Sequence, residues 1–152
     1  MEKPLNENDK RIVEYLAKYR CAQDESPEKY SFVLNYTGAE IYLAKNANVY
    51  PNFHKDFDDG KDIEIYDQPI DCKQTNPEYE NMTVNAIKAG LVYIQVIGKY
   101  PNYFLGGWIS GTDAKEVAQA RPNEDMPKYY IIKKKYLHPI DTFKKEYCRS
   151  GG

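Results

Sequence analysis

The spacing of hydrophobic residues near the amino terminus is typical of an amphipathic helix. Ile12, Leu16 and Tyr19 recur at intervals of four and three residues, which places them on one face of a helix. Asn8 is a residue type that often precedes a first helical turn and satisfies its free amides. We therefore expect a helix over residues 9–22 with Asn8 as its N-cap.

A second helix is predicted after a polar interruption. The stretch 23–31 is rich in charged and small polar residues and predicts a break in the chain. Thr37 and Glu40 are then spaced as in a capping box, in which a threonine hydroxyl and a glutamate three residues later satisfy each other's backbone amides. This spacing predicts a helix beginning at Thr37 and extending through the apolar positions up to Ala47.

From residue 61 the apolar positions alternate every second residue, which is typical of strands. Two short strands joined by a turn at Asp67-Gln68 are expected up to Thr75. The later elements expected are a central strand at 91–97, a strand at 103–109 interrupted by Gly106-Gly107, a helix at 114–120 capped by Ser110 or Thr112, a strand at 129–132 and a helix at 141–147. This order predicts a mixed α/β (α+β) sandwich with a central mixed β-sheet flanked by helices.

The expected hairpin separates apolar from charged side chains. With Asp67-Gln68 as its loop, Glu64 would pair with Asp71, and Asp62 with Lys73. Because side chains alternate along a strand, one face would carry Ile63, Ile65, Ile70 and Cys72, and the other Asp62, Glu64, Asp71, Lys73 and Thr75.

This charged face fits phosphodiester chemistry. Carboxylates are the ligands that Mg²⁺ prefers, and a bound ion activates water and polarises a phosphoryl oxygen. A lysine two residues after a ligand, as Lys73 follows Asp71, projects from the same face and would stabilise developing charge. The alternative is a solvated hairpin face with an Asp62–Lys73 surface ion pair, worth about 0–1 kcal/mol.

Three segments together resemble the PD-(D/E)xK nuclease superfamily, which has the restriction-endonuclease-like fold, and in particular its small phage- and prokaryote-type members. These segments are G-A-E-I-Y-L-A-K (38–45), G-K-D-I (60–63) and P-I-D-C-K-Q-T (69–75), followed more loosely by G-G-W-I (106–109) and Leu137-His138-Pro139. The resemblance implies a restriction-endonuclease-like core over about 37–110, within a single domain of residues 1–152 that adds an N-terminal helix (9–22) and a C-terminal strand and helix (129–147).

The resemblance also implies roles for individual residues. Asp62 and Asp71 would be metal ligands, Lys73 would assist the attacking water, and Glu40 would be a further ligand or an orienting group. Glu40 is equally explained as the third residue of the Thr37 capping box. The second acid is Asp rather than the more frequent Glu, no proline directly precedes Asp62, and the nearby acids at 58–59 leave the register of the first ligand open.

Several other residues are weaker candidates. Glu64, Thr75 and Gln74 would be accessory groups, although Gln74 points to the opposite face from Lys73, and Thr75 is also an ordinary strand residue. The run Lys133, Lys134 and Lys135 is expected either to contact phosphates or to be merely solvated. His54 has no partner residues with the spacing of a general-base site, and Trp108 is expected to be a packing residue.

Charge and composition limit the interpretation. The formal net charge of −2 provides no overall attraction to a polyanion, so nucleic-acid binding would require local patches. The three cysteines are odd in number and widely spaced, which favours a reducing, cytoplasmic location. No apolar run is long enough for a membrane span, and no signal peptide is recognisable.

The sequence therefore predicts a Mg²⁺-dependent hydrolase of DNA phosphodiester bonds, with Mn²⁺ as a substitute and an endonuclease as the first choice. An exonuclease, a junction-specific nuclease or an RNA-directed nuclease of the same fold are alternatives, because a fold does not choose among them. A non-catalytic nucleic-acid-binding or regulatory protein is the alternative from another class. So short a chain has little surface for reading a long target, which is compatible with a homodimer, a structure-specific substrate or a partner protein.

Overall fold

The structure is a computed structural model that describes residues 2–21, 26–49, 63–120 and 129–147. Its helices are α1 (Glu7–Arg20), α2 (Pro27–Ala47), α3 (Gly111–Val117), α4 (Asp141–Tyr147) and a short 3-10 helix (Lys134–Tyr136). Its strands are β1 (Ile63–Ile65), β2 (Gln68–Thr75), β3 (Met82–Val84), β4 (Val92–Lys99), β5 (Asn102–Ser110), β6 (Gln119–Ala120), β7 (Tyr130–Ile132) and β8 (His138–Pro139). None of the described helices has the length and apolar character needed to cross a membrane.

The strands form two sheets. The larger has the order β1-β2-β4-β5-β8, in which β2 and β4 run parallel and the other neighbours run antiparallel. The smaller has the order β3-β7-β6. The predicted mixed α/β class, with a central mixed sheet flanked by helices, is confirmed. The expected late strand is also present as β7, but it belongs to the second sheet, which the sequence did not predict.

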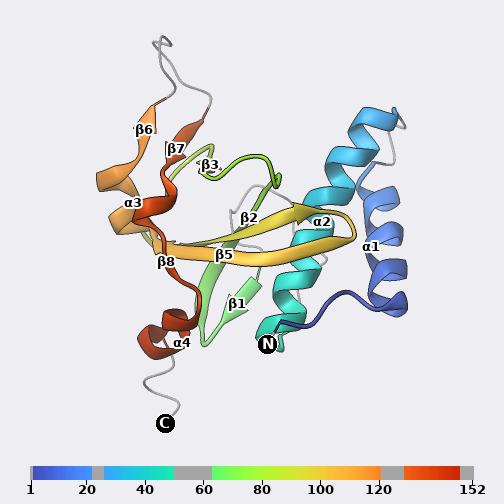
Figure 1. The fold of residues 1–152 in the computed structure, drawn as a ribbon, viewed down its shortest axis with the longest axis horizontal. Helices are drawn as coiled ribbons and strands as arrows, with labels where there is room; N and C mark the ends of the chain where they lie inside the picture. The colour runs from blue at the N-terminus through green and yellow to red at the C-terminus, as the bar shows by residue number, and fades with distance from the viewer. Residues whose placement is uncertain (1, 22–25, 50–62, 121–128, 148–152) are drawn as a thin grey trace.

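The larger sheet has a different core on each face. On one face, α2, α1 and α4 cover apolar residues that include Ile63, Ile70, Ile94 and Trp108. On the other face, Tyr93 and Ile109 pack with residues of α3 and the second sheet. Figure 1 shows α1 and α2 side by side at one side of the molecule, and α3 with β6 and β7 at the other. Residues adjacent along β2 or β4 therefore enter different cores.

Helix α1 begins two residues earlier than expected. Asn6, rather than Asn8, is its N-cap: Asp9 N donates to Asn6 Oδ1 at 2.9 Å, and Asn6 N donates to Asp9 Oδ2 at 2.8 Å. The buried face is also different, because Val13 and Ala17 are fully buried whereas Ile12 is exposed. Ala17 packs in one apolar cluster with Cys21 and with Val33 of α2.

Helix α2 begins at Pro27, so the predicted start at Thr37 is wrong. Ser26 is the N-cap and its side chain accepts from Lys29 N, while proline at the first position costs nothing because its missing amide would have no helical partner. Thr37 lies in mid-helix, fully buried, and its hydroxyl accepts from Arg20 Nη1 at 2.9 Å. Glu40 is therefore not a capping residue.

The turn between β1 and β2 lies one residue earlier than predicted. Tyr66 and Asp67 both have positive φ angles, 53° and 64°, as a two-residue hairpin turn with the sheet's right-handed twist requires. Glu64 consequently pairs with Pro69 and not with Asp71. The partner of each β1 residue moves by two positions, so the side chains still divide between the two faces of the hairpin as predicted. The isoleucines of the hairpin are buried, as expected.

The predicted interruption of the strand at Gly106-Gly107 is a bulge. Ile94 pairs with Trp108, whereas Val96 pairs with Leu105. Two glycines of β5 therefore lie opposite the single residue Gln95. A Cβ at Gly106 would overlap Oε1 of Gln95, so the missing side chain makes room for this glutamine.

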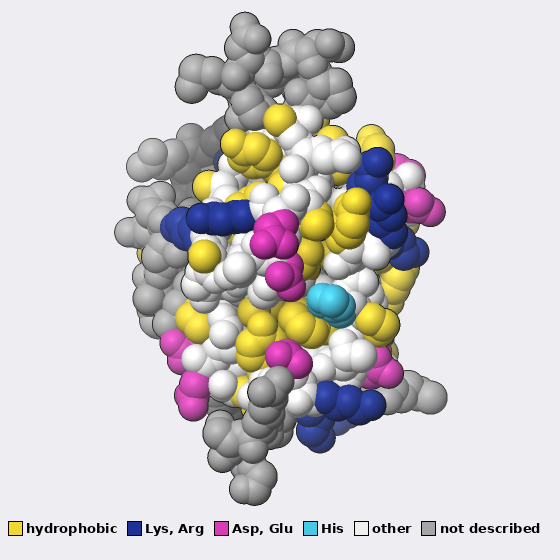
Figure 2. Space-filling model, turned by 90° about the vertical axis from the view of Figure 1, so that its left-hand side faces the viewer, with side chains coloured by type: hydrophobic (Ala, Val, Ile, Leu, Met, Phe, Trp, Pro, Cys, Tyr) yellow, Lys and Arg dark blue, Asp and Glu magenta, His cyan; other side chains and the backbone are white. Residues whose placement is uncertain are grey.

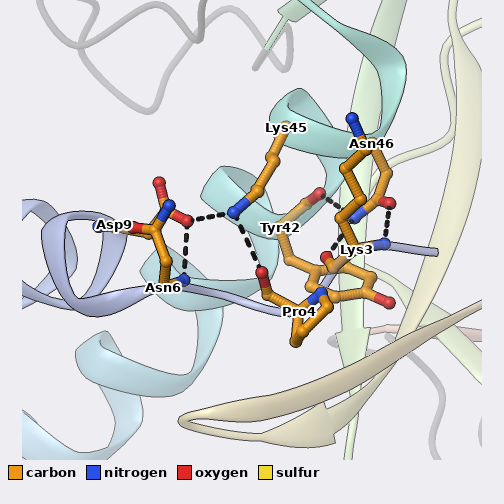
Figure 3. Close-up of polar contacts among 7 residues, drawn as sticks. All are labelled: Lys3, Pro4, Asn6, Asp9, Tyr42, Lys45 and Asn46. Atoms are coloured by element: carbon orange, nitrogen blue, oxygen red, sulfur yellow. Dashed lines mark hydrogen bonds and ion pairs between the residues drawn. The ribbon is translucent and has the colours of Figure 1, made fainter.

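The amino-terminal segment is attached to α2 (Figure 3). Lys3 N donates to Asn46 Oδ1 at 2.6 Å, and Asn46 Nδ2 donates back to the Lys3 carbonyl at 3.0 Å. Lys45 Nζ donates to the Pro4 carbonyl at 3.0 Å and pairs with Asp9 Oδ2 at 2.6 Å. Residues 3–9 thereby connect the end of α2 to the start of α1.

Candidate functional site

The candidate site is centred on Asp71 and Lys73 of β2, a strand between β1 and β4. Both side chains lie on the face that also carries Tyr93 of the second core. Lys73 Nζ is 3.3 Å from Asp71 Oδ1, and the two side chains are 26% and 11% exposed, respectively. The structure therefore brings together the two members of the acid-x-Lys motif as a largely buried ion pair that still reaches the surface.

A partly buried ion pair of this kind contributes little net stability to a fold. Removing two charges from water costs several kcal/mol, and their attraction in the interior often only offsets that cost. A packed hydrophobic pair would serve the sheet at least as well. Charged groups held partly buried at fixed positions are more typical of functional sites.

Strand β4 supplies the neighbours of this pair. The parallel register aligns Asp71 with Tyr93 and Lys73 with Gln95, so these four side chains share one face. Burial raises the pKa of Tyr93 above 10; the hydrogen bond from the Lys88 amide opposes this shift, and the negative charge of Asp71 adds to it. Tyr93 is therefore a neutral hydroxyl, which accepts from Lys88 N at 2.9 Å and donates to the Ala86 carbonyl at 3.1 Å.

Gln95 is a residue of the site that the sequence analysis missed. It is fully buried, and its Nε2 donates to Thr75 Oγ1 and to the Glu80 carbonyl, both at 3.1 Å. Among the residues that the structure describes, none is a hydrogen-bond partner of its buried Oε1. The sequence does contain a signal for this role, because Gln95 is a polar side chain within the otherwise mostly apolar run 91–97. Gln95 fixes Thr75, which lies two residues beyond Lys73 on the same face.

Glu40 occupies a different environment. It lies on α2, which covers the sheet face opposite to that of Asp71, and its Oε2 is 3.0 Å from Arg20 Nη2. The pair is mostly buried, with side chains 11% and 13% exposed. This contact connects α1 with α2, and it provides a structural role for a residue that the sequence also predicts to be a metal ligand.

The accessory candidates are separated by the sheet. Thr75 is buried on the face of Lys73, as predicted, whereas Gln74 points to the opposite face, where its Nε2 donates to Asn76 Oδ1 at 2.9 Å and to the Gly98 carbonyl at 2.7 Å. Glu64 is exposed and opposite Pro69. The first predicted ligand, Asp62, lies outside the described residues, as do His54 and the acids at 58–59.

The donor set fits a hard divalent cation in its chemistry. Within the described ranges there is no group of three or more His, Cys, Asp or Glu side chains that could hold an ion. Mg²⁺, however, is usually held by one or two carboxylates and retains several waters. Asp71 provides one such carboxylate at the edge of solvent, and Asp62 remains the predicted second.

The predicted basic run is exposed. Lys133, Lys134 and Lys135 follow β7, and all three are solvent-accessible. Figure 2 shows that the basic side chains visible on the face over α3 and α4 form separate groups with acidic side chains between them. The charge distribution on this face therefore favours local contacts with a polyanion over a continuous basic surface.

Comparison with protein-family models, with curated proteins and with solved structures finds no match. The functional proposal consequently rests on the residues of the chain and on their arrangement.

Trp108 is a packing residue, as predicted: it is 7% exposed, and its Nε1 donates to Thr142 Oγ1 at 2.9 Å.

Proposed function

We propose that this chain is a metal-dependent nuclease that hydrolyses DNA phosphodiester bonds, acting as an endonuclease. The observation that carries the proposal is the Asp71–Lys73 pair, in which a mostly buried carboxylate and an ammonium group 3.3 Å apart lie on one face of a central strand. The spacing agrees with the acid-x-Lys motif of the resemblance described above. The segments 38–45 and 60–63, which precede this motif in the sequence in the order that the resemblance requires, add to its support.

Each residue has a defined part in the proposed reaction. Asp71, with Asp62 as the predicted second ligand, would hold Mg²⁺ or Mn²⁺. A bound ion supplies Lewis-acid polarisation of the phosphate and lowers the pKa of a coordinated water. Lys73 orients the attacking water and stabilises the negative charge that grows on the phosphoryl oxygens. The hydrogen bond from Gln95 to Thr75 fixes the end of β2 and so helps to maintain the orientation of the Lys73 side chain.

The rigid position of Lys73 is important for this role. Its ammonium is already oriented by Asp71, and its strand is paired at this position with the central strand β4, where Lys73 lies beside the buried Gln95. A charge that needs no rearrangement during the reaction stabilises a transition state more effectively than a mobile one. Replacement of Lys73 should therefore reduce turnover much more than substrate binding.

Cleavage assays test the proposal. Supercoiled, linear, single-stranded and branched DNA, and RNA, are incubated with the protein with and without Mg²⁺ or Mn²⁺. We expect metal-dependent cleavage of circular DNA, with a loss of about 100-fold or more in Lys73→Met and Asp71→Asn. Lys99→Met is the matched control, because Lys99 forms an exposed ion pair with Glu78 at 3.5 Å, and it should cleave like the wild type.

The outcome is decisive if the variants are shown to be folded by circular dichroism. Absence of metal-dependent cleavage on every substrate, or full activity of folded Lys73→Met, would refute the nuclease. The substrate panel also separates the alternatives: cleavage only from ends indicates an exonuclease, and preference for branched DNA or for RNA indicates the corresponding nuclease of the same fold. Binding of Mn²⁺ by the wild type, lost in Asp71→Asn, is measured separately by calorimetry.

A further inference from the structure

A cavity of about 510 Å³ lies beyond the end of β2. Its walls come from the end of β2, the segment that leads to β3, β3 itself and the start of β7. The lining includes Thr75, Asn76, Tyr79, Asn81 and Tyr129. A volume of this size is in the range of small-molecule sites, and the lining combines aromatic rings with amide groups.

We propose that this cavity binds the base of an unpaired nucleotide in the nucleic-acid strand that crosses the site. The proposal rests on the nuclease function and specifies its substrate: a strand with at least one base out of the duplex stack. The second, larger cavity of about 670 Å³ adjoins α4 and the β1–β2 turn on the face opposite to Asp71, so it is not a continuation of the same site.

The tyrosines supply stacking surfaces. Tyr79 lines the cavity and 62% of its surface is exposed, so its side chain lies at the surface of the molecule and not in the core. Tyr129 contributes a second ring to the lining. An aromatic ring accepts any base on its flat face, and stacking of this kind is the usual source of affinity for single strands.

Two asparagines, Asn76 and Asn81, contribute amide groups to the lining of the cavity. Asn76 Oδ1 accepts from Gln74 Nε2 at 2.9 Å, and Asn81 Oδ1 accepts from Lys134 N at 3.1 Å. In each case the oxygen is used by the protein, and the amide nitrogen remains available among the described residues. Such donors complement the carbonyl and ring-nitrogen acceptors at the edge of a base. Glu80, which also lines the cavity, offers the complementary acceptor for an exocyclic amino group.

Positive charge adjoins the same opening. The hydrogen bond from Lys134 N to Asn81 places the exposed run Lys133–Lys135 next to the cavity wall. Lys135 Nζ lies 5.1 Å from the ring centroid of Tyr136, which keeps that ammonium near an aromatic surface. Phosphates on either side of a bound base would therefore meet lysines, whereas a neutral apolar ligand would gain nothing from them.

The cavity and the Asp71–Lys73 pair lie along one strand. Thr75, at the cavity, follows Lys73 by two residues, a distance of about 7 Å along a strand. A phosphate at Lys73 would therefore place the adjacent nucleotide at the cavity. A stacked base inside a duplex cannot enter a concave site, so the bound nucleotide must be single-stranded or flipped out.

Binding measurements in EDTA test this inference without cleavage. Fluorescence anisotropy compares a labelled single strand with the same sequence as a duplex, for the wild type and three variants. Tyr79→Ala should weaken single-strand binding about tenfold or more, because the stacking surface is removed. Tyr79→Phe, which retains the ring, and Tyr15→Ala, which removes a tyrosine 72% exposed on α1, should bind like the wild type.

The results separate this inference from the nuclease proposal. Equal binding by Tyr79→Ala and the wild type, or a wild type that does not bind the single strand, overturns the base pocket even if the protein cleaves DNA. Tyrosine-dependent single-strand binding without metal-dependent cleavage supports the pocket and overturns only the catalytic proposal. Because Tyr79 is exposed, loss of binding by misfolding is checked by the unfolding midpoint, which should match that of Tyr15→Ala.

Discussion

The guanidinium of Arg20 lies 3.0 Å from Oε2 of Glu40, and it also donates to Thr37 Oγ1 at 2.9 Å. Arg20 is the last residue of α1, whereas Glu40 and Thr37 lie in the middle of α2. The contact therefore connects two helices at a mostly buried position. It makes Glu40 a residue whose contributions to stability and to catalysis can be measured separately.

Glu40→Gln should lower the free energy of unfolding by about 1–3 kcal/mol, because it leaves a mostly buried guanidinium without its counter-charge. Glu78→Gln, which breaks the exposed pair with Lys99, should change it by less than about 0.5 kcal/mol. Urea denaturation measures both. Cleavage by folded Glu40→Gln should stay within about threefold of the wild type if the helix contact is its main role; a loss like that of Asp71→Asn, about 100-fold, would assign Glu40 to the reaction instead.

Gly106→Ala should destabilise the protein by about 1–3 kcal/mol. The added methyl would overlap Gln95 Oε1 and lie 3.0 Å from Ile97 Cδ1, and the fully buried Gln95 cannot move without breaking its hydrogen bonds to Thr75 and Glu80. Gly90→Ala is the control, because a Cβ there meets nothing within 4 Å. Chemical denaturation of both variants is the measurement. Equal stability of Gly106→Ala and the wild type would contradict the observed position of Gln95.

Alkaline pH should destabilise the protein through its buried tyrosines. Burial raises the pKa of Tyr103 above 10, and its hydroxyl donates to the Asn35 carbonyl at 2.9 Å. Below pH 10 both the folded and the unfolded states keep this tyrosine neutral. Above pH 10 the unfolded state releases the proton first, so the free energy of unfolding falls as pH rises towards the folded-state pKa.

Tyr103→Phe should therefore show a smaller loss of stability between pH 8 and about pH 11 than the wild type, although it begins less stable because it cannot form the hydrogen bond to Asn35. Tyr15→Phe, which changes a largely exposed ring, should follow the wild-type curve. Unfolding midpoints across this pH range test the comparison. If Tyr103→Phe and the wild type lose stability identically with pH, ionisation of Tyr103 does not cause the loss of stability at alkaline pH.

Lys134→Ala should reduce the salt dependence of single-strand binding. Removing one lysine–phosphate interaction lowers the slope of log affinity against log salt concentration by about 0.7 for a single strand. Lys18→Ala, an exposed substitution on α1, should leave the slope unchanged. Anisotropy titrations at several salt concentrations provide the slopes. A slope unaffected by Lys134→Ala would place the bound strand away from the basic run.

Hydrophobic periodicity predicted the elements with regular patterns. The central strand, the interruption of the next strand at Gly106-Gly107 and the final helix over Asp141–Tyr147 all occur where expected. The alternating faces of β1 and β2 were also predictable, because a strand has a period of two residues. The proximity of Asp71 and Lys73 follows from this period alone.

Local signals were less reliable where two were in competition. Ser26-Pro27 is a good helix start, but it stands inside a polar stretch that indicated a break, and the capping-box spacing of Thr37 and Glu40 indicated a later start. The hairpin turn at Tyr66-Asp67 contains no glycine, although both of its residues have positive φ. Sequence preference therefore favoured the wrong pair of turn residues.

The sequence by itself determined that a carboxylate and a lysine project from one face of a strand, since alternation along a chain is a local property. Only the tertiary structure decided what surrounds them. The parallel pairing of β2 with β4 brings Gln95 beside Lys73. The packing of α1 on α2 forms the ion pair between Arg20 and Glu40. Strand β7 contributes a wall to the cavity beyond Thr75. These contacts join residues far apart in the chain, and their formation depends on the burial of apolar surface across the whole fold.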